Sequence, residues 1–155
     1  MISFSIPGLG DFSIAHLVSD VNGTIAVDGA LIPGVAEAFH SLAEVVDIHL
    51  LTADTHGRQK TLDEQLGLIA VRIPAGSEAA AKAEYVRKLS GGAAAIGQGA
   101  NDAGMLEAAD VGICVSSQEG TAVETLLKAD LFVPDILAGL DLLLKPVRLT
   151  ATLRR

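Results

Sequence analysis

The sequence predicts an α/β protein whose central sheet is parallel and is covered by helices on both faces. Short apolar runs of strand length alternate with amphipathic segments of about ten residues, and Gly or Pro stands between many of them. Strands that alternate with helices in this way form βαβ units, which require parallel strands. The 155 residues contain no internal repeat, low-complexity stretch or linker, so we expect a single domain over 1–155.

Six apolar runs are predicted to form the strands of this sheet. In chain order they are 12–21, 45–51, 68–73, 93–97, 110–115 and 131–133. Residues 1–6 alternate polar and apolar side chains and end at a Pro-Gly pair, which indicates an edge strand or an ordered arm. Residues 25–32 form two short apolar pieces around Asp28-Gly29, a strong signal for a β-hairpin.

Six helices are predicted between and after these strands. They span about 35–44, 58–66, 77–89, 100–109, 119–128 and 135–144. Gly67 is expected to end the second helix as a C-cap, and Ser77 to cap the start of the third. Pro146 is expected to end the last helix, and the tail from about 147 to 155 is expected to be loosely ordered.

Composition and charge argue against some classes of function and leave others open. The net charge of −8 argues against a nucleic-acid footprint, which needs a basic face, but not against phosphate substrates, which local groups bind. Cys114, the only cysteine, lies in an apolar run and is expected to be a small buried hydrophobe. The sequence shows neither a signal peptide nor an apolar run of membrane-spanning length. We therefore expect a cytoplasmic protein with no nucleic-acid or membrane partner.

Polar side chains follow three of the predicted strands, and the third helix contributes a lysine. These residues are Asp20, Asn22, Thr52, Lys82, Gln98, Asn101 and Asp102. The carboxyl ends of parallel strands lie along one edge of the sheet, so we expect these side chains to converge. An aspartate nucleophile, a hydroxyl, a lysine and a second acid form a coherent set for phosphoryl transfer. Taken alone, Lys82 would more often be a solvated surface lysine, and Asp20 could equally well be an Asx-turn residue that closes a strand.

Histidines add little to this set. His56 lies in the loop after Thr52, where a single histidine more often faces solvent than a site. His16, His40 and His49 lack the spacing of metal ligands, and we interpret them as structural.

The order and spacing of these segments resemble the haloacid dehalogenase (HAD) superfamily of phosphatases and phosphotransferases. Within it they resemble the phosphorylation domain of P-type ATPases. The matching segments are DVNGT (20–24), LLTAD (50–54), KAEYVRKL (82–89), AIGQGANDA (95–103) and AADVGI (108–113). The resemblance covers about 17–133, and it implies a HAD-like, Rossmann-like three-layer sandwich with a small hairpin flap. It also implies a Mg²⁺-dependent phosphohydrolase or phosphotransferase that forms a phosphoaspartate.

The resemblance implies a role for each matching residue. Asp20 matches the nucleophile, Thr52 a phosphate-binding hydroxyl and Lys82 the lysine that steadies the phosphoaspartate. The implied catalytic residues are therefore Asp20, Thr52 and Lys82. The implied metal-site residues are Asp20, Asn22, Gln98 and Asp102. The implied phosphate-binding residues are Gly23, Thr52, Ala53, Lys82 and Asn101.

Two positions depart from the family pattern. Asn22 stands where phosphatase members carry an aspartate that acts as general acid and base, and an amide cannot transfer a proton at neutral pH. Gln98 stands where the family has an aspartate that ligates Mg²⁺, and a neutral amide is a weaker ligand for a hard cation. We therefore expect slow phosphoryl chemistry and weak metal binding.

The chain also lacks insertions that larger relatives carry. Only a hairpin and one helix are predicted between Thr24 and Thr52, where P-type ATPases insert a nucleotide-binding domain. No cap domain is predicted either, so the site would be open to a phosphorylated small molecule or protein. A second copy of the chain could close it, which would make a homo-oligomer.

Two functions remain open at this point. The leading hypothesis is an enzyme that acts through phospho-Asp20, favoured by the joint presence of Asp20, Thr52, Lys82 and Asp102. The alternative is a catalytically impaired relative that binds phosphate or a partner as a regulatory module. Asn22 and Gln98 favour this alternative.

Overall fold

A six-stranded parallel sheet forms the centre of the computed structural model, which describes residues 1–54 and 57–155. The strand order is β10-β9-β8-β3-β6-β7. In chain order the strands are β3 (His16–Asp20), β6 (Asp47–Thr52), β7 (Val71–Arg72), β8 (Ala93–Gly97), β9 (Val111–Val115) and β10 (Leu131–Val133). This arrangement confirms the predicted parallel sheet. It also places the carboxyl ends of β8, β3 and β6 side by side.

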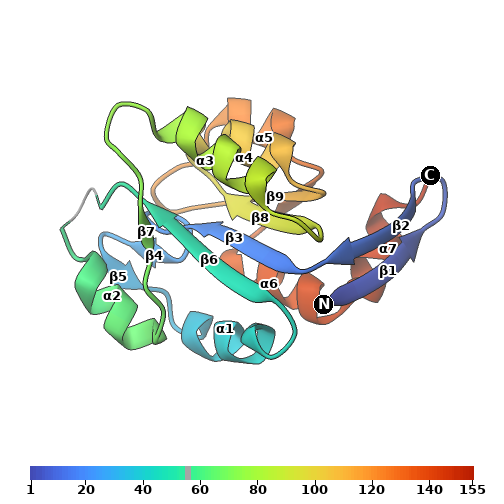
Figure 1. Cartoon of the computed structure of the whole chain (residues 1–155), viewed down its shortest axis with the longest axis horizontal. Helices are drawn as coiled ribbons and strands as arrows, with labels where there is room; N and C mark the ends of the chain where they lie inside the picture. The colour runs from blue at the N-terminus through green and yellow to red at the C-terminus, as the bar shows by residue number, and fades with distance from the viewer. Residues whose placement is uncertain (55–56) are drawn as a thin grey trace.

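Helices cover both faces of this sheet, as Figure 1 shows. One face carries α1 (Val35–Ala43), α2 (Gln59–Leu66) and α6 (Ile136–Leu144), and the other carries α3 (Glu78–Lys88), α4 (Ala103–Ala108) and α5 (Val123–Lys128). A 3₁₀ turn, Ala100–Asp102, precedes α4. Phe39 and Leu140 belong to the core beneath α1 and α6, whereas Val86 and Met105 belong to the core beneath α3 and α4. The result is the three-layer sandwich that the sequence predicted.

The two ends of the chain form an arm beside the sheet (Figure 1). Strands β1 (Ile2–Ile6) and β2 (Gly10–Ile14) pair antiparallel, and α7 (Pro146–Leu153) packs against β1. The prediction of a loose tail at 147–155 is therefore wrong for most of it, because Leu149 is buried and the Thr150 hydroxyl donates to the Ser5 carbonyl at 3.0 Å. Pro146 does end α6, but it also begins α7, where its missing N–H costs nothing.

The predicted strand 12–21 is broken at Ala15. The N–H groups of Ala15 and His16 both donate to the Gly92 carbonyl, which moves the chain from the β1–β2 hairpin to the central sheet. A Cβ at Gly92 would lie 1.9 Å from the Ser13 carbonyl oxygen, so only glycine permits this approach. The break therefore depends on a residue distant in sequence, which the local apolar pattern does not reveal.

A small hairpin after β3 forms the predicted flap. Strands β4 (Ala26–Val27) and β5 (Ala30–Leu31) pair antiparallel. Asp28 and Gly29 between them both have positive φ, 50° and 77°, as a type I′ turn requires. The flap is held on two sides, because the Asp28 N–H donates to Glu119 Oε2 at 3.2 Å and Arg58 Nη1 donates to the Asp28 carbonyl at 3.5 Å.

Three further predictions differ from the structure in detail. The third strand, expected at 68–73, is reduced to β7. The helix expected at 119–128 begins only at Val123, because Gly120 has φ 90° and the Ala122 N–H donates to the Gln98 carbonyl. Ser77 precedes α3 as predicted, but its hydroxyl contacts the Pro74 carbonyl and does not cap the helix. The prediction that His56 faces solvent concerns a residue outside the described ranges.

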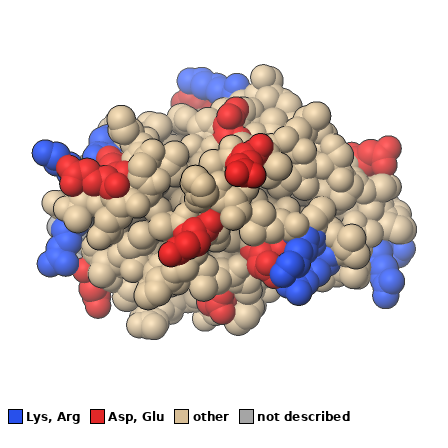
Figure 2. Space-filling view, turned by 90° about the horizontal axis from the view of Figure 1, so that it is seen from below, with Lys and Arg blue, Asp and Glu red and all other residues tan. Residues whose placement is uncertain are grey.

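The surface is sparsely and evenly charged on the face that Figure 2 shows. Acidic and basic side chains occur there singly or beside each other, and no broad basic area is visible. Among the described residues, no helix has the length and apolar character needed to cross a bilayer.

A chain of side-chain hydrogen bonds joins β3, β6 and α3 at the amino ends of the strands. His16 Nε2 lies 2.9 Å from the Ser90 carbonyl oxygen, so it must carry the hydrogen, and His16 Nδ1 accepts from His49 Nε2 at 3.1 Å. His49 Nδ1 then accepts from the Tyr85 hydroxyl at 2.9 Å. Burial, followed by the neighbouring His16, lowers the pKa of His49, and Asp47 opposes both. The two paired histidines are structural, as predicted.

This histidine pair should make stability depend on pH. When the pKa of a base is lower in the folded chain than in the unfolded chain, the folded protein loses stability as the pH falls through the pKa of the unfolded chain. We expect the melting temperature of the wild type to fall between about pH 7.5 and pH 5.5 by more than that of His49→Asn. The matched control His40→Asn, at an exposed position of α1, should keep the full wild-type decrease. An equal decrease in wild type and His49→Asn would contradict this account.

Candidate functional site

A buried lysine lies between two buried aspartates at the carboxyl edge of the sheet. Lys82 Nζ in α3 donates to Asp20 Oδ1 at the end of β3 and to Asp102 Oδ1 in the 3₁₀ turn, each at 2.7 Å. Lys82 is 2% exposed, Asp20 6% and Asp102 0%. Because an isolated buried charge is costly, these three groups must stay together. The structure thus rejects the alternative that Lys82 is a solvated surface lysine.

The two Oδ1 atoms of the cluster accept from Lys82, and the two Oδ2 atoms accept from other donors. Asp20 Oδ2 accepts from the Thr24 hydroxyl at 3.0 Å. Asp102 Oδ2 accepts from the backbone N–H groups of Gln98 and Gly99, each at 3.0 Å. A Cβ at Gly97 would lie 2.7 Å from the Asp102 carboxyl group, so glycine is needed there for Asp102 to reach Lys82.

Lys82 attracts both carboxylates of the cluster, whereas Asp20 and Asp102 repel each other. Burial by itself lowers the pKa of Lys82, but the Asp20 and Asp102 carboxylates outweigh it and the pKa is raised. Burial and then the Asp20 carboxylate raise the pKa of Asp102, against the Lys82 ammonium and the Gln98 N–H. Lys82 is therefore a permanent cation that fixes the Asp20 carboxylate in place.

The end of β6 contributes a hydroxyl. Thr52 Oγ1 accepts from the Asp54 N–H at 2.9 Å and from Asn22 Nδ2 at 3.4 Å. Asp54 adopts φ 53°, and its Oδ1 accepts from the Gln59 N–H at the start of α2. This strained turn orients the Thr52 hydroxyl. In both of these hydrogen bonds the hydroxyl oxygen accepts, so neither of them uses the hydroxyl hydrogen.

The loop after β3 and the loop after β8 contact each other through an amide. Gln98 Nε2 donates to the Asn22 carbonyl at 3.2 Å. Since a carbonyl oxygen can only accept, the orientation of the Gln98 amide follows from this contact. Gln98 also lies directly against Gly23, where a Cβ would be 1.9 Å from Nε2. The Gly23 N–H itself donates to the Ala26 carbonyl at 2.7 Å, so its predicted contact with phosphate would require that bond to open.

These groups surround a cavity of about 360 Å³. Its lining residues are Asp20, Asn22, Ala53, Lys82, Gln98, Gly99, Ala100 and Asn101. Asn101 Oδ1 also accepts from Lys82 Nζ at 3.2 Å. Most predicted site residues therefore meet at one cavity, but three do not line it: Asp102 lies behind Lys82, Thr52 is buried, and Gly23 lines a neighbouring cavity. Gly99, Ala100 and the Asp20 partner Thr24 were not predicted as site residues, although Thr24 follows Asp20 at turn spacing.

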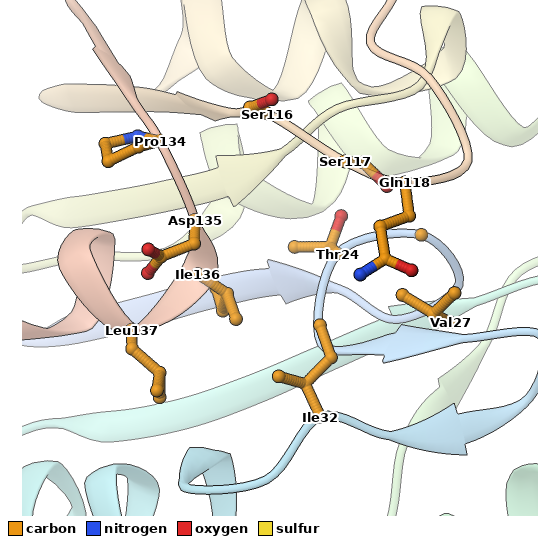
Figure 3. A pocket seen from close by; sticks show the side chains of 11 residues that line it. Thr24, Val27, Ile32, Ser116, Ser117, Gln118, Pro134, Asp135, Ile136 and Leu137 are labelled. Atoms are coloured by element: carbon orange, nitrogen blue, oxygen red, sulfur yellow. The ribbon is translucent and has the colours of Figure 1, made fainter.

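A larger cavity of about 410 Å³ lies beside Thr24 in the loop after β3 (Figure 3). Its lining residues are Gly23, Thr24, Val27, Ile32, Ser116, Ser117, Gln118, Pro134, Asp135, Ile136 and Leu137. Several of its polar groups are engaged locally: Ser117 Oγ accepts from the Glu119 N–H, and Asp135 Oδ1 accepts from the Ala138 N–H. Because reactive groups converge at Asp20 and not here, the smaller cavity is the candidate site.

The predicted magnesium ligands do not fit a cation in this arrangement. Each Asp20 oxygen keeps one lone pair beside the hydrogen bond it accepts, but the Asn22 carbonyl faces the N–H of Gln98, which is a donor and not a ligand. Asp102 is fully buried behind Lys82. Among the described residues, no group of three or more His, Cys, Asp or Glu could hold a metal ion.

Sequence comparisons place the chain beside P-type ATPases. No family model matches it. It is 31% identical over 134 residues to copper-transporting ATPase 2 of Mus musculus, a match that covers 81% of this chain but 9% of that protein. It is 52% identical over 60 residues to an uncharacterised protein of Methanocaldococcus jannaschii, covering 39% of this chain and 64% of that one. The chain thus spans less than two thirds of the curated relatives it matches.

Structural comparisons agree with this picture. A 3-deoxy-D-manno-octulosonate 8-phosphate phosphatase from Moraxella catarrhalis, solved with magnesium, phosphate and KDO, has a TM-score of 0.67 at 17% identity and covers 89% of this chain and 90% of that one. A zinc-transporting PIB-type ATPase in its E2.Pi state has a TM-score of 0.64 at 30% identity and covers 79% and 20%. The predicted resemblance is confirmed: the chain has the HAD-like fold, and its structural neighbours are HAD-superfamily hydrolases and the phosphorylation domain of P-type ATPases.

Proposed function

We propose that this protein transfers or hydrolyses phosphoryl groups through Asp20. The observation that carries the proposal is the buried contact of Lys82 with both Asp20 and Asp102 beside an open cavity. A cation buried against a carboxylate at the mouth of a cavity suits a group that becomes an acyl phosphate, because the lysine can stabilise the charge that develops there. The phosphatase neighbours support the same reaction class.

The reaction has two steps. An Asp20 oxygen attacks phosphorus, the bond between phosphorus and the leaving-group oxygen breaks, and Asp20 becomes an acyl phosphate. Water then attacks that phosphorus, the bond between phosphorus and the Asp20 oxygen breaks, and inorganic phosphate leaves with the carboxylate restored. In both steps Lys82 neutralises phosphoryl charge, and the Asn101 amide, which lines the cavity, can hold a phosphoryl oxygen.

Turnover is expected to be slow because the site lacks a proton-transfer group at Asn22. The Asn22 amide contacts Thr52 Oγ1 and lines the cavity, so it holds the position from which a leaving group would be protonated. An amide binds there without exchanging a proton. The magnesium dependence implied by the resemblance is not part of this proposal, because the ligands do not fit a cation as they stand.

A phosphate-binding or regulatory module is the second candidate. The hydrogen bond from the Gln98 side chain to the Asn22 backbone carbonyl favours it, because both residues replace acids and this bond joins their two loops. The substrate under either proposal is a phosphorylated small molecule or protein. Closure of the open cavity by a second copy of the chain also remains a prediction, which the molar mass in solution would test.

The nucleophile can be identified by intact mass. We expect the wild type, incubated with acetyl phosphate with and without Mg²⁺, to gain one phosphoryl group, and Asp20→Asn to gain none. Asp28→Asn, at the exposed tip of the flap, is the matched control and should react like the wild type. An adduct that persists in Asp20→Asn would place the chemistry at another residue.

The missing proton donor should be restored by Asn22→Asp. Alkyl phosphates have a leaving group that needs a proton, so their hydrolysis should rise by up to about 10²–10⁴-fold. Nitrophenyl phosphate, whose leaving group departs without a proton, should gain much less. Steady-state rates for both substrates give the comparison, with Asn22→Ala as the control that removes the amide without adding an acid. Equal gains for both substrates would argue against a proton-transfer role at this position.

The buried lysine should be needed for stability. Lys82→Met leaves the Asp20 and Asp102 carboxylates buried without their cation, which should cost about 3–5 kcal/mol in urea unfolding. Adding Asp102→Asn should recover part of this loss, because one uncompensated charge disappears. Lys88→Met in the same helix removes only an exposed ion pair with Glu84, which solvent screens, and should cost far less than Lys82→Met. A loss in Lys82→Met no larger than in Lys88→Met would contradict the buried arrangement.

A further inference from the structure

We propose that the Gln98 amide takes the place of a divalent cation, so that this site binds phosphate without a metal. The inference rests on the proposed function, since it concerns how the cavity at Asp20 holds the phosphoryl group. It commits the site to inorganic phosphate, or the phosphoryl part of a substrate, as a ligand held by hydrogen-bond donors and Lys82.

The position of the Gln98 amide carries the first step. Its Nε2 lies 3.2 Å from the backbone carbonyl oxygen of Asn22, a residue of the predicted metal site. A Mg²⁺ ion bound to that oxygen would lie about 2.0–2.1 Å from it and would face a polarised N–H group. Since a carbonyl oxygen has two lone pairs, a cation could use only the one that Gln98 leaves, and it would have a donor and not a ligand atom of Gln98 beside it.

The amide is also held in this orientation by its surroundings. Gln98 is 9% exposed, and Nε2 lies against Gly23, where any side chain would displace it. The neighbouring Gln98 N–H donates to Asp102 Oδ2, and the Gln98 carbonyl accepts from the Ala122 N–H. These contacts fix the backbone on both sides of the side chain. A turned amide would instead bring Oε1 against the Asn22 carbonyl, with two oxygens in contact.

The second N–H of the amide supplies the phosphate contact. A carboxamide nitrogen has two hydrogens, and the Asn22 carbonyl uses one of them. Gln98 lines the cavity together with Lys82 and Asn101. Nε2 can therefore donate its second hydrogen to a phosphoryl oxygen while the first keeps the loop in place. A cation would neutralise phosphate charge here, whereas the amide contributes a dipole and leaves Lys82 as the cation.

Binding of inorganic phosphate tests the proposal, measured by calorimetry in EDTA and in Mg²⁺. The wild type should bind with the same affinity in both. Gln98→Asp places a carboxylate where the amide was, so it should lose phosphate binding in EDTA and regain it in Mg²⁺. Gln98→Leu, which has neither donor nor charge, should bind about tenfold more weakly or worse in both conditions, as expected when a hydrogen bond to an anion is lost.

A matched control and the possible outcomes separate this proposal from the proposed function. Gln118→Asp makes the same change at an exposed residue of the neighbouring cavity and should bind phosphate like the wild type. Melting curves confirm that each variant is folded. If the wild type binds phosphate only in Mg²⁺, or if Gln98→Leu binds as well as the wild type, the Gln98 proposal is overturned and the phosphate site survives. If neither the wild type nor Gln98→Asp binds phosphate in either condition, the proposed function fails with it.

Discussion

The buried ammonium group of Lys82 is the constraint on which the rest of the site depends. It joins α3 to the end of β3 through Asp20 and to the 3₁₀ turn through Asp102. Each of the three charges would be costly if buried alone, so the helix and both loops must keep one relative position. The close approach of Asp102 to Gly97 and its bonds to the N–H groups of Gln98 and Gly99 follow from the same requirement. The position of the Asp20 carboxylate thus depends on how α3 and the 3₁₀ turn pack against the sheet.

The turn after β3 transmits this order to two cavities. The Val21 carbonyl accepts from the N–H groups of Thr24, Ile25 and Ala26, which folds the chain back directly after Asp20. Gly23, with φ 79°, lies on this turn between the phosphoryl cavity and the larger apolar cavity. The Thr24 hydroxyl reaches back to Asp20 from the wall of the larger cavity. A change in the position of Thr24 in that wall would therefore act on the Asp20 carboxylate through this hydrogen bond.

Local patterns predicted the sheet and the convergence of the site, because each strand end is marked by a polar residue and a turn. Asp20, Thr52 and Gln98 could be placed at one edge because the strands of βαβ units are parallel and their carboxyl ends lie along one edge of the sheet. The break at Ala15 could not be predicted, since it depends on Gly92. The helix at 146–153 was missed because Leu149 is buried against an arm formed by the other end of the chain. The direction of the Gln98 amide was also beyond the sequence, because residue type alone does not say which of its two atoms faces a carbonyl.

The two departures from the family pattern are not independent of each other. Gln98 Nε2 contacts the Asn22 carbonyl, and Asn22 Nδ2 contacts the Thr52 hydroxyl. One amide chain thus links the ends of β8, β3 and β6, where acids would repel one another unless a cation lay between them. Because residues in contact have non-additive effects, restoring an acid at one position changes the surroundings of the other. An aspartate at 98 without a cation would withdraw the donor that holds the backbone of the Asn22 loop, so a change at 98 alters the position of residue 22 as well.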